Sequence, residues 1–195
     1  MKRLKNRSGF SLAETLLAVL ILLLVSGIVV AGVPAARNAF DKIVLGANAQ
    51  TMLSTAVNAL RDELGTAWDV KIVTEEGSDT LQYFNSNTGA RSKLMKDAGG
   101  AITLQDYVPL DTATSLIHDT SSAAGTERHL VPDTHSRLYV TYTSIEVDAT
   151  TNIVSVTGLK VCKKTDDNEI VSIGKDDEGN ELALKIRVLS SKATP

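Results

Sequence analysis

The residue with the clearest chemical consequence is Glu14, a carboxylate at the start of a long apolar segment. Four basic residues and no acidic residue precede it, namely Lys2, Arg3, Lys5 and Arg7. No charged residue follows it until Arg37. An ionised carboxylate costs about 2.5–3.5 kcal/mol or more in the hydrocarbon core of a membrane. We therefore expect Glu14 to have a specific partner of opposite charge or a specific task.

The uncharged segment 15–36 is long enough to cross a membrane. As a helix it covers about 33 Å, against about 30 Å of hydrocarbon. The preceding basic residues predict a cytoplasmic N-terminus, with everything after Arg37 outside. A cleaved secretory signal peptide is the alternative. That reading is disfavoured because signal peptides have only about 7–15 apolar residues and Glu14 would hinder insertion.

Residues 9–14 are Gly, Phe, Ser, Leu, Ala and Glu in that order. Behind a short basic leader, this order resembles the N-terminus of type IV pilin and pseudopilin precursors. The resemblance implies that a membrane-embedded prepilin peptidase cuts between Gly9 and Phe10 and methylates the new amine of Phe10. Ala13 is a mild departure, because the family more often has Ile or Val there. The resemblance is confined to the N-terminal part of the chain.

The physical chemistry of Glu14 fits this resemblance. An opposite charge within about 4–6 Å favours the ionised carboxylate, and the freed ammonium of Phe10 supplies one, in the same chain or in a neighbour. Buried polar groups are best attested as devices that set register. We therefore expect the pair to fix the axial offset between subunits of a fibre. The alternative is a single-pass anchor with Glu14 at the headgroup level.

One long helix is expected from about Phe10 to Leu64, and Gly65 is a plausible stop. Gly32 and Pro34 predict a kink or local unwinding, because Pro34 lacks a backbone donor and crowds the preceding turn. After Arg37 the pattern becomes amphipathic. The expected apolar stripe comprises Phe40, Ile43, Val44, Ala47, Leu53, Val57, Leu60 and Leu64.

The remaining chain predicts an extracellular β-rich head, so the fold class is α+β, with a long N-terminal helix packed against a C-terminal antiparallel sheet. The expected organisation is a leader 1–9, a transmembrane half of the helix 10–34, an amphipathic half 35–64 and a head 65–195. In the head, 66–135 is expected to be variable, with one or two extra strands, and 136–190 to form the antiparallel sheet. Candidate strands are 136–148, 153–163, 169–173 and 182–189.

The other residues whose side chains could do chemistry provide little evidence for a functional site. His118, His129 and His135 have no zinc spacing. Asp176, Glu178 and Asn180 alternate like the opening ligands of a calcium loop, but the glycine and the bidentate Glu of an EF-hand are out of place, so a solvated hairpin turn is preferred. The single cysteine, Cys162, has no partner for an internal disulfide. We expect no enzyme activity, no cofactor and no bound metal.

Charge argues against a nucleic-acid role. The formal net charge is −3, and removal of the four leader cations leaves 16 basic residues against 23 acidic ones, or −7. Lys160, Lys163 and Lys164 do cluster, but such a group on an acidic domain is typical of a protected strand edge. We therefore regard nucleic acid as an unlikely partner.

The sequence thus predicts a structural subunit of a type IV pilus or related filament, with a minor subunit favoured. It waits in the membrane with its head outside and then joins a surface filament. By resemblance, its partners are other subunits through the N-terminal helix, the prepilin peptidase, an assembly ATPase and a platform membrane protein. The alternatives are a pseudopilin of a type II secretion or DNA-uptake system, and an anchored surface-binding domain that does not polymerise.

Overall fold

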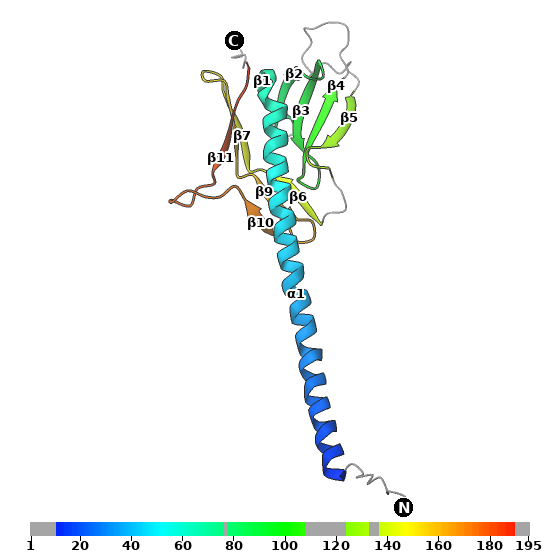
Figure 1. Ribbon diagram of the computed structural model, residues 1–195. Coiled ribbons are helices and arrows are strands. Elements are labelled where there is room, and N and C mark those ends of the chain that lie inside the picture. The colour runs from blue at the N-terminus through cyan, green and yellow to red at the C-terminus, as the bar shows by residue number, and fades with distance from the viewer. Residues whose placement is uncertain (1–10, 76–77, 108–123, 133–136, 190–195) are drawn as a thin grey trace, which may run out of the picture. The chain divides into compact units, whose positions relative to one another are not determined.

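The computed structural model describes residues 11–75, 78–107, 124–132 and 137–189 (Figure 1). The chain divides into two compact units, residues 1–45 and residues 46–195. Helix α1 belongs to both of them, and all strands belong to the second. We call the second unit the head. Each unit is described by itself.

Helix α1 spans Leu12–Gly65. Ser11 caps its start, because its Oγ accepts the amide of Ala13 at 3.3 Å and its carbonyl accepts the amide of Glu14 at 2.9 Å. The expected long helix and its end at Gly65 are confirmed. Local unwinding at Pro34 is not observed, since the helix is continuous there. A kink at Gly32 and Pro34 stays a prediction.

The part of α1 in the first unit is exposed, and before Arg37 it is apolar around its whole circumference. By length and composition the helix can cross a membrane. Its exposed large side chains include Leu12, Leu16, Leu17, Val19, Leu20, Ile21, Leu22, Leu23, Leu24, Val25, Ile28, Val29, Val30, Val33, Phe40, Ile43 and Val44. A helix that is apolar on all sides needs either protein or lipid around it.

The first part of the head is a five-stranded antiparallel sheet in the order β1-β2-β3-β4-β5 (Figure 1). Its strands are β1 (Ala67–Glu75), β2 (Ser78–Asn85), β3 (Ala90–Lys96), β4 (Ile102–Tyr107) and β5 (Ala124–His129). The expectation of one or two strands in 66–135 is therefore wrong. Glycines and polar residues in this region make tight hairpin turns, as at Gly100, where φ is 80° and the amide bonds to the Asp97 carbonyl.

The second part of the head contains two three-stranded sheets. One has the order β10-β9-β6 and the other β11-β8-β7. The strands are β6 (Leu138–Thr141), β7 (Ser144–Asp148), β8 (Ile153–Thr157), β9 (Lys160–Lys163), β10 (Glu169–Ser172) and β11 (Ala183–Arg187). Each of the expected strands 136–148 and 153–163 is in fact two strands in different sheets, so these two predictions are wrong.

The chain changes sheets at Thr143 and at Gly158. The Thr143 amide bonds to the carbonyl of Thr157, and Gly158 has φ 65°, a conformation that suits glycine. A Cβ on Gly158 would collide with the side chains of Thr143 and Glu181. The two crossing points therefore lie against each other. Pairing between distant segments determines where the chain changes sheets, and the local alternation of residue types does not reveal it.

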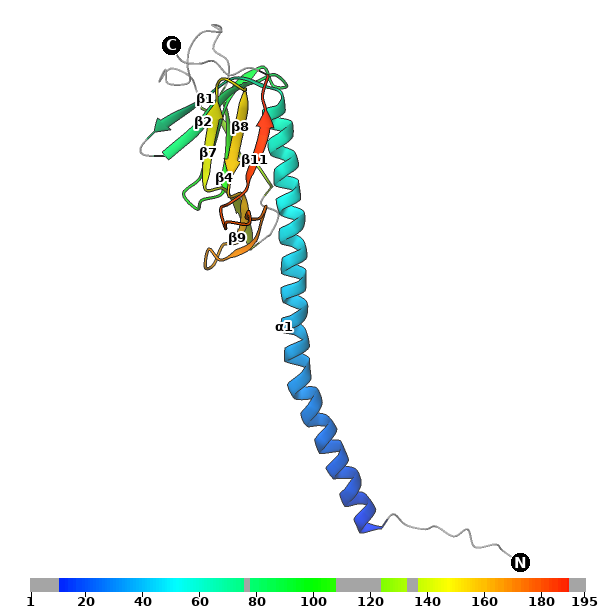
Figure 2. The same cartoon turned by 90° about the vertical axis from the view of Figure 1, so that its left-hand side faces the viewer.

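Residues 46–65 of α1 lie along the strands of the head (Figures 1 and 2). The buried side of the helix consists of Ala49, Ala56, Leu60 and Leu64. Ala49 and Ala56 are small enough to let the helix approach the sheets closely, and the sequence stripe omitted them. Phe40, Ile43 and Val44 were expected in this stripe but are exposed.

A row of three leucines forms the centre of the core under the five-stranded sheet. Leu81, Leu94 and Leu104 lie directly opposite one another on β2, β3 and β4, and all three are fully buried. Such cross-strand pairs are the units that stabilise a sheet. The α+β fold class, with a long N-terminal helix and a C-terminal antiparallel β region, is confirmed.

Candidate functional site

The predicted assembly site lies at the start of α1. Glu14 is in the first helical turn and is exposed. A negative charge there interacts favourably with the helix dipole. Gly9 and Phe10 lie outside the described residues, so the cleavage point and the charge pair with Phe10 stay predictions. The geometry that the structure does give is a carboxylate on an uncovered apolar helix.

A second glutamate of α1, Glu63, has the opposite environment. Its Oε1 accepts hydrogen bonds from the Tyr83 hydroxyl at 2.8 Å and from Asn85 Nδ2 at 2.7 Å. Its Oε2 accepts one from Arg128 Nη2 at 3.1 Å, and Arg128 Nε lies 3.6 Å from Asp106 Oδ2. The last turns of the helix are thereby tied to β2, β4 and β5.

This network changes the proton affinity of its members. Burial and the neighbouring Glu63 carboxylate raise the pKa of Tyr83 well above its usual value. Burial alone would lower the pKa of Arg128, but the hydrogen bond and charge of Glu63, together with Asp106, raise it overall. Tyr83 therefore stays a neutral donor and Arg128 a cation, and the carboxylate of Glu63 is fully used in holding the helix to the sheet.

A cavity of about 570 Å³ opens in the head between the five-stranded sheet and the β10-β9-β6 sheet. Its apolar lining includes Met52 of α1, Ile102, Leu138 and Val140. Sites for small molecules have volumes of about 300–1,000 Å³ and mostly apolar walls. The cavity therefore has the size of a small-molecule site, but its walls combine apolar with polar side chains. Sequence analysis gave no sign of it because its walls come from distant segments.

Two pairs of polar side chains lie in the wall of this cavity. Asp97 Oδ2 lies 3.9 Å from Nδ1 of His129, and its Oδ1 accepts the amides of the following turn. The Tyr139 hydroxyl donates to Asp167 Oδ1 at 2.9 Å, and burial together with this bond raises the pKa of Tyr139 to about 12. The Tyr139 bond joins β6 to the turn between β9 and β10, and the Asp97 contact brings the β3–β4 turn close to β5.

The predicted turn at 176–180 is a self-contained polar loop between β10 and β11. Asp176 Oδ1 accepts the amides of Glu178 and Asn180, and Asn180 Nδ2 donates to Asp176 Oδ2 at 3.1 Å. These bonds, led by that of the Asn180 side chain, lower the pKa of Asp176. Within the part of the chain that the structure describes, no group of three or more His, Cys, Asp and Glu side chains is placed to hold a metal ion.

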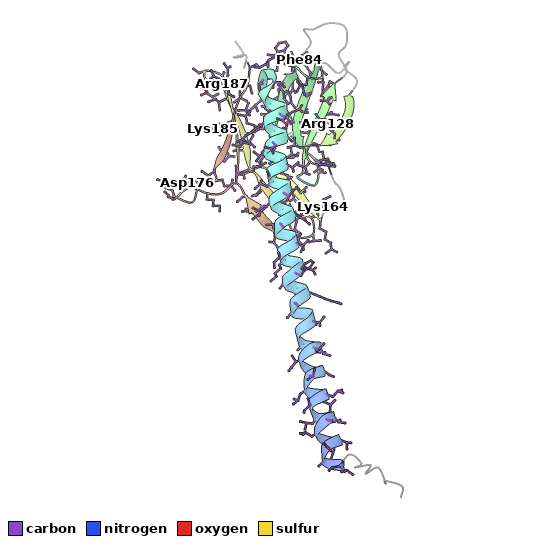
Figure 3. The ribbon with its side chains drawn as sticks, in the orientation of Figure 1. Phe84, Arg128, Lys164, Asp176, Lys185 and Arg187 are labelled. Carbon is purple, nitrogen blue, oxygen red and sulfur yellow. The ribbon has the colours of Figure 1, made fainter. Side chains whose placement is uncertain are left out.

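The remaining sequence candidates are spread over the head. His118 and His135 lie outside the described residues, and His129 lies at the cavity. Asp176 and Arg128 lie on opposite sides of the head in Figure 3. The lysine cluster is paired with acids, since Lys160 Nζ lies 3.8 Å from Glu181 Oε1 and Lys163 Nζ lies 3.5 Å from Asp166 Oδ2.

Cys162 is a buried free thiol in β9, and burial raises the pKa of its thiol. It lies opposite Tyr139 of β6 and Glu169 of β10. A neutral, covered thiol behaves as a small apolar core residue. Its place in the core of the head agrees with the absence of any second cysteine in the sequence.

Comparison with known proteins gives no identification: no family model, no curated protein and no solved structure matches this chain.

Proposed function

We propose that the chain is a pilin-like structural subunit of a type IV pilus or related filament, and that it is a minor subunit. The observation that carries the proposal is the exposed apolar part of α1, which begins with Glu14 and leads into a separately folded head. This arrangement supports a protein whose N-terminal helix is covered by lipid before assembly and by other helices afterwards. The order of residues 9–14 supports the same reading.

The proposed mechanism starts with cleavage after Gly9. It frees an ammonium group on Phe10, four residues before Glu14, which is one helical turn. In hydrocarbon the two charges stabilise each other, and the pairing of Glu14 with the Phe10 amine of a neighbour sets the stagger between subunits. Apolar packing of the exposed helices supplies the association. A prepilin peptidase, an assembly ATPase and a platform membrane protein are the proposed partners.

The head is proposed to lie outside the cell, in the membrane-anchored form and in the filament. The basic residues before the span support this topology, because cytoplasmic flanks carry the excess of Lys and Arg. A pseudopilin of a secretion or DNA-uptake system would share every one of these features. A permanently anchored surface-binding domain would share the span and the head but would keep its leader.

The decisive experiment is mass spectrometry of the mature N-terminus, from cells with an active prepilin peptidase. We expect the mature chain to begin at Phe10 and to carry one N-methyl group. An intact leader contradicts filament assembly and supports an anchor. A chain that begins near Arg37 contradicts both and indicates a secreted protein.

A second experiment tests the role of Glu14. The Glu14→Ala variant should be cleaved like the wild type but should enter filaments at least about ten-fold less well, because an unpaired buried ammonium is left behind. Incorporation is measured by immunoblot of sheared filaments against the membrane fraction. Equal incorporation of the variant would show that the proposed register role is wrong.

A further inference from the structure

Four side chains form a row across one end of the five-stranded sheet. Trp68 of β1 pairs with Phe84 of β2, Phe84 pairs with Arg91 of β3, and Arg91 pairs with Tyr107 of β4. Residues directly opposite each other in antiparallel strands point to the same face. Tyr83, which precedes Phe84 and bonds to Glu63 of α1, points to the other face. The row therefore lies on the face that does not bond to Glu63.

Trp68 is exposed to solvent, and its ring is also held in position by a neighbouring ring. It is the one tryptophan of the sequence, and 41% of its surface is exposed. Its ring centroid lies 4.6 Å from that of Phe84, with the planes tilted by 47°. Phe84 is half-buried and lies at the end of the sheet, at the top of the head in Figure 3. Because Phe84 fixes the indole ring, little conformational entropy is lost when a ligand packs on it.

The charge beside this aromatic pair is neutralised internally. A bulge after Trp68 gives Asp69 a φ of 54° and brings its carboxylate to Arg91, with Oδ2 2.6 Å from Nη2. Arg91 Nη1 is buried without a hydrogen-bond partner. Because Asp69 neutralises Arg91, the row carries no net charge.

Small polar groups border the rings on the side of the β2–β3 turn. Ser86 Oγ donates to the Thr66 carbonyl at 2.6 Å, and Asn87 Nδ2 donates to Thr66 Oγ1 at 3.2 Å. These bonds hold the turn against the residues just before Trp68. Ser86, Asn87 and Thr88 are exposed, so their hydroxyl and amide groups can also bind a ligand that lies on the rings.

We propose that this site, the Trp68 surface (Trp68, Phe84, Arg91 and the turn 86–88), binds a neutral glycan. A pyranose ring presents C–H groups on one side, which pack on an aromatic face, and hydroxyls at its rim, which bond to hydroxyl and amide groups. Both kinds of contact are available here. This binding activity goes beyond the proposed role in a filament and does not depend on assembly.

Charge and area exclude the two competing ligands. A nucleic acid needs unpaired cations for its phosphates, whereas Arg91 is paired with Asp69 and the chain is acidic overall. A stable protein interface needs an apolar core patch much larger than one half-exposed tryptophan. A sugar chain requires only this small aromatic platform with polar groups beside it.

The test uses the full chain in a detergent without a sugar headgroup. Because Trp68 is the single tryptophan, its fluorescence reports on the site directly. Titration with the tetramer of N-acetylglucosamine and with the tetramer of glucose should shift the emission saturably for at least one of them. A thymidine oligonucleotide is titrated in parallel. No shift with either sugar, or a salt-sensitive shift with the oligonucleotide alone, would overturn the proposal.

Variants then separate stacking from general apolar association. Gel electrophoresis through a matrix containing the polysaccharide that binds gives an affinity without fluorescence. Trp68→Ala should weaken binding about ten-fold or more, by analogy with the loss of one aromatic ring that stacks a nucleic-acid base. The control is Leu182→Ala, because Leu182 is equally exposed, at 43%, but lies outside the row. Equal losses in both variants, with both chains folded by circular dichroism, would refute the site.

Discussion

The two parts of helix α1 differ in what surrounds them, although their backbone conformation is the same. Residues 12–44 are exposed, carry Glu14 at their start and are apolar on every side before Arg37. Residues 46–65 bury one side, made of two alanines and two leucines, and carry Glu63 near their end. The apolar side chains of the first part have no cover from their own chain, whereas those on the buried side of the second part pack in the head. The same residue type, leucine or glutamate, therefore has a different energetic role in each part.

The largest expected effect comes from truncating one leucine in each part of the helix and comparing the two variants. Leu60→Ala should lower the free energy of unfolding of the head by about 2–5 kcal/mol, because it leaves a cavity in a closed core. Leu20→Ala should leave it unchanged, since Leu20 is 56% exposed. Urea unfolding of the full chain in detergent, followed by circular dichroism of the β-sheets, measures both. If the two variants unfold alike, the division of the helix into two roles is wrong.

The two glutamates give the next contrast. Glu63→Ala should cost about 2–3 kcal/mol of head stability, because the buried Tyr83 hydroxyl and Asn85 amide lose their acceptor. Arg128→Met should cost about 1 kcal/mol, since the Arg128 side chain is 45% exposed and water replaces part of the bond. Glu14→Ala should not change the unfolding midpoint. A head that tolerates the loss of Glu63 would show that the network does not hold the helix to the sheet.

Glycine substitutions sharpen the comparison further. Gly158→Ala should destabilise the head by about 2 kcal/mol, because the residue has φ 65° and its new methyl group meets Thr143 and Glu181. Gly32→Ala has open space around it and helical dihedrals, so the head should unfold at the same urea concentration as in the wild type. Thermal denaturation gives the same ranking independently. An unchanged Gly158→Ala variant would mean that the crossing between sheets relaxes easily.

The last expected effect is a dependence on alkaline pH, which concerns the head. Burial raises the pKa of both Tyr139 and Tyr142 from 10.0 to about 12. The folded state then holds these protons more tightly than the unfolded state, so the contribution of these two groups to stability is constant below pH 10 and is lost as the pH rises from 10 toward 12. The urea midpoint at several pH values, read with the phenolate absorbance, checks this sign. Tyr139→Phe should show a shallower fall, and a midpoint independent of pH would contradict the buried neutral phenols.

How much the sequence revealed also differs between the two parts. The long helix, its apolar half and its end at Gly65 follow from local composition, because membrane-length hydropathy and capping are local properties. The five strands of residues 67–129 were underestimated, because their turns are rich in Gly, Ser and Asp and their apolar stretches are short. The crossings at Thr143 and Gly158 depend on pairing between distant segments, which no spacing encodes.

The same reason explains why the candidate sites were only partly predictable. Glu14 is conspicuous in sequence because its neighbours are apolar. Glu63 is not, since its partners Tyr83 and Arg128 lie 20 and 65 residues further along the chain. The aromatic row is equally hidden, because the register of four strands brings its members together and no spacing in the sequence does.

The solitary thiol of the head has a practical consequence. Because the core closes around one cysteine and needs no sulfur cross-link, the head should fold without an oxidase and keep its structure under reducing conditions. The rate at which a maleimide dye labels Cys162 then reports unfolding of the head. Labelling should be slow in the native chain and fast once β9 separates from its neighbours. The chain is therefore expected to tolerate purification with or without a reducing agent, since its one cysteine leaves no mispaired disulfide to form within the chain.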